Sequence, residues 1–206
     1  MVKLLYRDHL LEQILPEIQS VSKIRMQKQM QSFGYLEHIL NNTHLYFFDH
    51  AHAINTYFHN ASKRIALKLA VLLPSLEAAL LRARQLHCSR KEIDSITMLA
   101  RYADHFSDAM SADKTDRIFL LHRIGAHLYS LVLYQICQEC ICQFTDSLTV
   151  YYCREMLDLY HGEYQKRARL IPLLSGDELM HTLEIPASPF IGHILSELER
   201  LTLNGS

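Results

Sequence analysis

The residues with the clearest chemical use in this 206-residue chain are basic and occur in short runs. Lysine and arginine neutralise phosphate groups, so a run of them along one side of a protein can follow a nucleic-acid backbone. The formal net charge of the chain is -1, so any such surface is local, and an ordinary solvated helix face is the alternative interpretation. The candidate phosphate-binding residues are Lys63, Arg64, Lys68, Arg82, Arg84, Arg90, Lys91, Lys166, Arg167 and Arg169.

Histidines are the second group that could do chemistry, because the chain contains 13 of them. His50 and His52 project about 200° apart on a helix, so they cannot both face one metal ion. We expect His38, His52 and His59 to lie on polar or partly buried helix faces. No metal site, catalytic residue or cofactor is predicted, since phosphoryl transfer needs clustered carboxylates and the chain has no Asp-x-Asp pair.

Cysteines form a third group, with Cys137, Cys140, Cys142 and Cys153 close enough in sequence to suggest zinc. Cys137 and Cys140 fall three residues apart in an apolar stretch, where cysteine packs as a small hydrophobic side chain. A zinc knuckle usually contains a glycine, and none is present there. Free thiols are therefore expected, without zinc.

Tyrosines recur at helical spacing in the second half of the chain. Packing at the core and its rim is the first interpretation, with hydroxyl groups that reach solvent. A platform on which bases stack is the alternative. The residues concerned are Tyr129, Tyr134, Tyr151, Tyr152, Tyr160 and Tyr164.

Helical periodicity dominates the elements that must position these side chains. Apolar residues spaced by three and four predict one long amphipathic helix over 35–57, preceded by a loop or frayed helix at 27–32. The apolar stretch 65–73 predicts a buried helix that stops or kinks at Pro74. Further helices are expected over 4–18, 76–86, 90–106, 113–124, 128–144, 148–164, 175–183 and 191–201.

Capping residues set several of these boundaries. Ser62 and Ser75 are expected to cap the helices that follow them, because a serine oxygen accepts a hydrogen bond from a free helical N–H. Ser89 and Glu92 have the spacing of a capping box. Ser175 is expected to precede a short helix.

Composition suggests an all-α protein with a helical body over 1–170 and a small helical tail over 171–206. Six glycines are too few to favour a Rossmann or P-loop enzyme. No apolar run reaches the roughly 20 residues that a membrane helix needs. Charged residues near Met1 and an odd number of cysteines lead us to expect a cytoplasmic protein with no membrane partner.

Three segments resemble one family when they are taken in order. Residues 86–94 follow the pattern Leu-x-x-Ser-x-Lys-Glu-Ile, 116–125 precede the apolar helices, and 173–205 contain the tail pattern with Gly176, Pro189 and Gly192. Together they resemble the C-terminal helical region of tRNA nucleotidyltransferases and bacterial poly(A) polymerases. The family usually has a glycine where this chain has Ala187 or Ser188.

The resemblance implies a neck, body and tail that hold tRNA by its shape and phosphates, without the head domain that adds nucleotides. It also implies a body related to HD-type hydrolases, in which His38 matches the first ligand while Pro74 and Ser75 stand where a His-Asp pair belongs. We therefore expect an RNA-binding region that performs no nucleotide transfer itself. Its expected partners are tRNA or a similar structured RNA, and a separate nucleotidyltransferase head. The alternatives are a degenerate HD-type metal-dependent phosphohydrolase and a scaffold for such a head.

Overall fold

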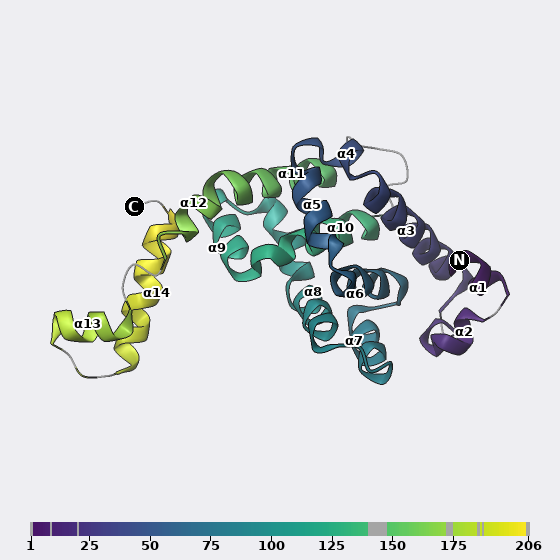
Figure 1. Cartoon of the computed structure of the whole chain (residues 1–206), viewed down its shortest axis with the longest axis horizontal. Coiled ribbons are helices and arrows are strands. Elements are labelled where there is room, and N and C mark those ends of the chain that lie inside the picture. The colour runs from purple at the N-terminus through teal and green to yellow at the C-terminus, as the bar shows by residue number, and fades with distance from the viewer. Residues whose placement is uncertain are drawn as a thin grey trace. The chain divides into compact units, whose positions relative to one another are not determined.

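The computed structural model describes residues 2–8, 10–19, 21–139, 148–171, 175–184, 186 and 188–204. Every regular element within these ranges is a helix (Figure 1). The predicted all-α class is therefore confirmed. No helix in the described ranges has both the length and the apolar character needed to span a membrane.

Contacts between residues divide the chain into two compact units. Unit 1 comprises Met1–Ser107 and Ala126–Cys153, and unit 2 comprises Asp108–Gly125 and Arg154–Ser206. The division between a body and a tail at residue 170 is not tested by these contacts and stays a prediction. Each unit is described here by itself.

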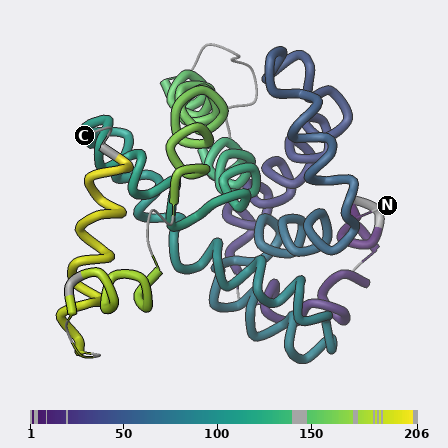
Figure 2. Tube along the Cα trace, turned by 60° about the vertical axis from the view of Figure 1, so that its left-hand side comes forward, coloured from purple at the N-terminus to yellow at the C-terminus, as the bar shows by residue number. Residues whose placement is uncertain are grey.

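Unit 1 is built around three helices that pack on one another, α3, α6 and α10, and Figure 2 traces the chain through them. Leu36, Leu67 and Leu133 from these helices are at most 1% exposed. Burying a leucine contributes about 1.5–3 kcal/mol, so these contacts hold the unit together. Its elements are α1 (Val2–Arg7), α2 (Leu11–Ile14), η1 (Pro16–Ile18), α3 (Lys23–Asn41), α4 (Thr43–Tyr46), η2 (Phe48–His50), α5 (Ala51–His59), α6 (Ala61–Leu72), α7 (Leu76–Gln85), most of α8 (Arg90–Asp108), α10 (Leu128–Gln138) and the first half of α11 (Leu148–Leu159).

The single helix predicted over 35–57 is wrong, and of the two alternatives for 27–32 the loop is wrong, because this stretch is helical. α3 already begins at Lys23 and includes the polar stretch, because Met26 and Met30 are buried at 2% and 7% exposure. It ends at Asn41 and is capped by Asn42, where φ is -134° and the side-chain amide donates to the carbonyl of His38 at 2.9 Å. The rest of the predicted helix is divided among α4, η2 and α5.

Three of the four predicted helix starts are confirmed. Ser75 accepts from the N–H of Ala78 at 3.1 Å. The side chain of Glu92 accepts from the Ser89 N–H at 2.6 Å, while Ser89 Oγ accepts from the Glu92 N–H at 3.4 Å. The prediction for Ser62 is wrong, because the side chain of Asn60 caps α6 by accepting from the Ser62 N–H at 2.9 Å.

Unit 2 contains the remaining helices, in which α14 packs on α9 and α13 packs on α14. Gly125 ends α9 with a φ of +51°, a conformation that favours glycine. The predicted start of α13 is confirmed, since Ser175 and Glu178 form a complete capping box. Its elements are the end of α8, η3 (Ala109–Ser111), α9 (Lys114–Ile124), the first residue of η4 (Gly125–His127), the end of α11, the π-helical turn η5 (Tyr160–Tyr164), α12 (Gln165–Ala168), α13 (Gly176–Leu183) and α14 (Pro189–Asn204).

Candidate functional site

The predicted basic residues are distributed over both units. Lys63, Arg64, Lys68, Arg82, Arg84, Arg90 and Lys91 belong to unit 1, whereas Lys166, Arg167 and Arg169 belong to unit 2. Their availability to a phosphate group differs greatly from one residue to the next. It depends on burial and on the carboxylates within each unit.

Three of these predicted residues are neutralised by carboxylates of the same unit. Lys68 Nζ lies 2.6 Å from Glu37 Oε1. Arg82 holds Glu17 with Nη2 2.7 Å from Oε1, and both side chains are mostly buried. Arg167 pairs with Glu163 and also donates to the carbonyl of Leu203. A phosphate would have to break these contacts, so they are poor RNA ligands.

Lys63 faces the interior of unit 1. Its Nζ donates to Ser95 Oγ at 3.3 Å and lies 5.3 Å from the centroid of the Tyr57 ring. Burial lowers the pKa of Lys63, while the nearby Asp94 raises it. Ser95 is 1% exposed and donates its own proton to the carbonyl of Lys91 at 2.7 Å. The contact is therefore a packed hydrogen-bond chain and lacks the geometry of an activated serine nucleophile.

The ends of α7 and α8 and the link between them carry a group of exposed basic residues. Arg84, Arg90 and Lys91 are exposed, and the side chain of Arg90 is 95% accessible with its carboxylate neighbour, Asp94, 3.9 Å away. His87 is exposed between them with a left-handed φ of +53°. We call Arg84, His87, Arg90 and Lys91 the junction cluster. The sequence prediction missed His87, although its place in a short helix–helix link was a usable signal.

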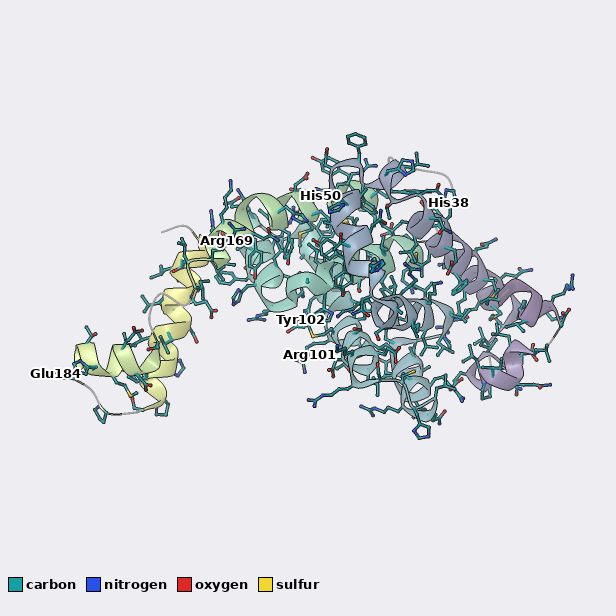
Figure 3. All side chains as sticks on the ribbon, viewed as in Figure 1. His38, His50, Arg101, Tyr102, Arg169 and Glu184 are labelled. Atoms are coloured by element: carbon teal, nitrogen blue, oxygen red, sulfur yellow. The ribbon has the colours of Figure 1, made fainter. Side chains whose placement is uncertain are left out.

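Three further predicted residues are also exposed. Arg64 donates from Nη2 to the carbonyl of Phe58 at 3.0 Å, which holds the guanidinium against α5. Lys166 is exposed on α12, and Arg169 is exposed just after it (Figure 3). Unit 2 thus offers two accessible cations on either side of the engaged Arg167.

A cavity of about 220 Å³ in unit 1 was not predicted from the sequence. Its polar lining consists mainly of Arg25, Lys28, Gln29 and Ser32 from α3, together with Tyr134 from α10. Burial, followed by Asp104 and Glu77, raises the pKa of Tyr134 to about 12. The available signal is the group of cations near the start of α3, but the sequence predicts a loop or a frayed helix for the polar stretch at 27–32.

The histidine and cysteine predictions concern metal binding. His38, His52 and His59 are exposed, which agrees with polar helix faces. Cys137 and Cys153 are fully buried, and burial raises the pKa of Cys153. Cys140 and Cys142 lie outside the described residues. Within the described part of the chain, no three His, Cys, Asp or Glu side chains converge on a point that could hold a metal ion.

The tyrosines mostly serve packing, as predicted. Tyr129, Tyr152, Tyr160 and Tyr164 are all at most 8% exposed, whereas Tyr151 is 66% exposed. The Tyr152 hydroxyl donates to the carbonyl of Phe106 at 2.7 Å. The buried rings are inaccessible to a base, so a stacking platform gains no support from them.

One further polar chain lies within unit 2. His122 Nε2 is 2.7 Å from Glu199 Oε1, and His122 Nδ1 is 3.5 Å from the hydroxyl of Tyr164. The π-helical turn that carries Tyr164 is a feature often found at functional sites. Burial raises the pKa of Tyr164, however, so its hydroxyl stays protonated. The chain joins α14 to α9 and is best explained as a structural contact.

Comparison with known proteins gives no match for this chain, whether to protein-family models, to curated proteins or to solved structures. The family resemblance therefore rests on the three sequence segments. Two of these segments overlap features described above, the junction cluster and α9. Residues 86–94 contain His87, Arg90 and Lys91 of the junction cluster, and 116–125 form most of α9.

Proposed function

We propose that this chain is an RNA-binding helical region that positions a tRNA or a similar structured RNA and performs no nucleotide transfer of its own. The observation that carries the proposal is the exposure of the junction cluster. Duplex RNA hides its base edges, so a helical protein recognises it through shape, phosphates and 2′-hydroxyls. Exposed arginine and lysine side chains are suited to this kind of contact.

The local charge balance of the junction cluster supports this function. Arg84, Arg90 and Lys91 are three cations within eight residues. Glu92, the nearest acid in that stretch, is engaged in the capping box with Ser89. The cap fixes the start of α8, so Arg90 and Lys91 project from an ordered turn.

Lys166 and Arg169 provide a second contact region in unit 2 under this proposal. Both are exposed, and the intervening Arg167 anchors their helix through Glu163 and the carbonyl of Leu203. Each unit would then carry its own phosphate-binding region. Such binding weakens steeply with salt because counterions are released from each phosphate.

We further propose an ancestry shared with HD-type domains in which the metal motif has been lost. Pro74 and Ser75 occupy the positions at which the family resemblance requires the His-Asp pair. Their structural roles support this interpretation. The Pro74 carbonyl accepts from Arg25 Nη2 at 2.8 Å, and Ser75 caps α7. These two residues form a helix boundary and supply no imidazole or carboxylate.

Fluorescence anisotropy with labelled tRNA at 50 mM and 200 mM salt tests the proposed function. We expect binding that weakens by roughly a factor of ten or more between these salts. The triple variant Arg84→Gln/Arg90→Gln/Lys91→Gln should weaken binding about tenfold at 50 mM salt. It should also reduce, by about 2, the slope of the logarithm of the binding constant against the logarithm of the salt concentration.

The matched control removes three other exposed cations, Lys23, Arg101 and Arg123, by substitution with glutamine. It changes the net charge equally, so a general charge effect would weaken both variants alike. We expect the control to bind tRNA within about threefold of wild type. Absence of tRNA binding at 50 mM salt, or equal losses in both triple variants, would show the proposal to be wrong.

A further inference from the structure

We propose that the cavity lined by α3, α10 and the link between α6 and α7 binds a small phosphate ester that also carries a hydroxyl group. This site lies apart from the junction cluster in sequence and is independent of the RNA-binding proposal. It is argued from the groups that line it, all of which belong to unit 1.

The charge of the lining favours an anion. Arg25 and Lys28 both line the cavity, and none of its nine lining residues is an aspartate or glutamate. The first turn of α3 also contains no acidic residue. Cations near a helix N-terminus are unfavourable because the helix dipole is positive there. A bound anion would relieve this repulsion and interact with both side chains.

Arg25 is held in a position suited to such an anion. Its Nη2 donates to the carbonyl of Pro74 at 2.8 Å, which fixes the guanidinium at the wall of the cavity. A guanidinium carries five N–H donors in a rigid fork, so several remain for phosphate oxygens. The hydroxyls of Ser32 and Tyr134 belong to the same lining, and that of Tyr134 stays protonated as a donor at neutral pH.

The amide of Gln29 indicates that the ligand carries a donor as well as negative charge. Its Oε1 atom is buried and has no hydrogen-bond partner in the described structure. A buried acceptor without a partner is unfavourable, and a fully ionised phosphate cannot satisfy it. An adjacent hydroxyl group on the ligand would donate to this oxygen.

The size and the apolar wall limit the carbon skeleton of the ligand. The cavity volume of about 220 Å³ is below the roughly 300–1,000 Å³ of sites for drug-sized molecules. Val71, Leu73 and Pro74 form its apolar side. A phosphorylated polyol of a few carbon atoms fits this combination better than a nucleotide, which is larger and has an aromatic base.

Isothermal titration calorimetry of the full chain at pH 8 in phosphate-free buffer tests this site with glycerol 3-phosphate, methyl phosphate and glycerol as probes. Methyl phosphate is the reference anion because its dianion has no O–H donor. We expect glycerol 3-phosphate to bind at least threefold more tightly than methyl phosphate, and glycerol to give no signal. Lys28→Gln should weaken binding of both anions about tenfold. Lys23→Gln is the matched control, because Lys23 is exposed in the same helix but does not line the cavity. It should change either affinity less than twofold.

Gln29→Met tests the hydroxyl part of the proposal separately from the anion part. It should lower the affinity for glycerol 3-phosphate to that of methyl phosphate and leave the affinity for methyl phosphate unchanged. Circular dichroism of each variant confirms that the fold is retained. Three results would overturn the proposal. Neither anion binds at 10 mM, wild type binds both anions equally well, or Lys28→Gln and Lys23→Gln lose the same amount of affinity. None of these results would alter tRNA binding at the junction cluster, so the two proposals fail separately.

Discussion

The guanidinium of Arg82 in α7 and the carboxylate of Glu17 in η1 form a close, largely buried ion pair. Nη2 lies 2.7 Å from Oε1, Nε lies 2.8 Å and 3.0 Å from the two carboxylate oxygens, and the side chains are 14% and 17% exposed. The pair joins the N-terminal segment of unit 1 to α7. It also occupies the guanidinium of a residue that the sequence analysis predicts as a phosphate ligand.

Removal of one member of this pair should destabilise unit 1. Glu17→Ala leaves the largely buried Arg82 charge without its partner, which should lower the free energy of unfolding by about 2 kcal/mol. Arg84→Ala, on the exposed side of the same helix, should change it by less than about 0.5 kcal/mol. Urea unfolding monitored by circular dichroism measures both values. Equal stability of Glu17→Ala and wild type would contradict the assigned role.

His127 should make the stability of unit 1 depend on pH. Its Nδ1 atom is buried without a hydrogen-bond partner, and burial and then Lys63 lower its pKa to about 4, against the opposite effect of Asp94. The unfolded chain takes up this proton near pH 6.5, whereas the folded chain stays neutral until about pH 4. This stabilisation is therefore complete above pH 6.5 and is lost as the pH falls from about 6.5 towards 4.

The measurement compares urea unfolding of wild type and His127→Phe at pH 7.5 and pH 5.0. Because His127 is only partly buried, we expect wild type to lose about 1 kcal/mol more than the variant on acidification. The exposed His52 provides the control, since His52→Asn should follow the wild-type pH dependence. A pH dependence of His127→Phe identical to wild type would exclude His127 as its cause.

Local features of the fold were predictable from the sequence, whereas long-range pairings were not. Ser75, Ser89 and Ser175 act on N–H groups three residues away, so their patterns are visible in a short window. The extent of α3 depends on Met26 and Met30 being buried in unit 1, and a polar local sequence concealed this. The helical spacing gave no sign of the carboxylates that engage Lys68 and Arg82, or of the cavity, because their parts are distant in sequence.

The cap assignments predict different effects of two similar serine substitutions. Ser89→Ala removes the acceptor for the Glu92 N–H and the hydroxyl that donates to Glu92, so it should cost about 1 kcal/mol. Ser62→Ala should cost less than about 0.5 kcal/mol, because Asn60 caps α6 instead. Thermal unfolding of both variants checks the difference. A larger loss for Ser62→Ala would show that its hydroxyl stabilises α6 after all.

The basic residues around α12 should separate binding from stability within unit 2. Lys166 and Arg169 are exposed, so Lys166→Gln/Arg169→Gln should weaken tRNA binding about three- to tenfold at 50 mM salt and leave the melting temperature unchanged.

Arg167→Gln should lower stability and leave tRNA binding nearly unchanged. The guanidinium of Arg167 contacts Glu163 and the carbonyl of Leu203 in α14. Glu163 also accepts from Lys114 at 2.5 Å, and this contact is the first cause of the lowered pKa of that carboxyl. Without Arg167, the charge of Glu163 is still paired with Lys114. We therefore expect the free energy of unfolding to fall by only about 1 kcal/mol. The affinity for tRNA should stay within about threefold of wild type. Anisotropy and thermal melts on the same samples give both values. Arg167→Gln could instead weaken tRNA binding as strongly as Lys166→Gln/Arg169→Gln, with no change in stability. That result would contradict the prediction that only the exposed cations of this segment contact tRNA.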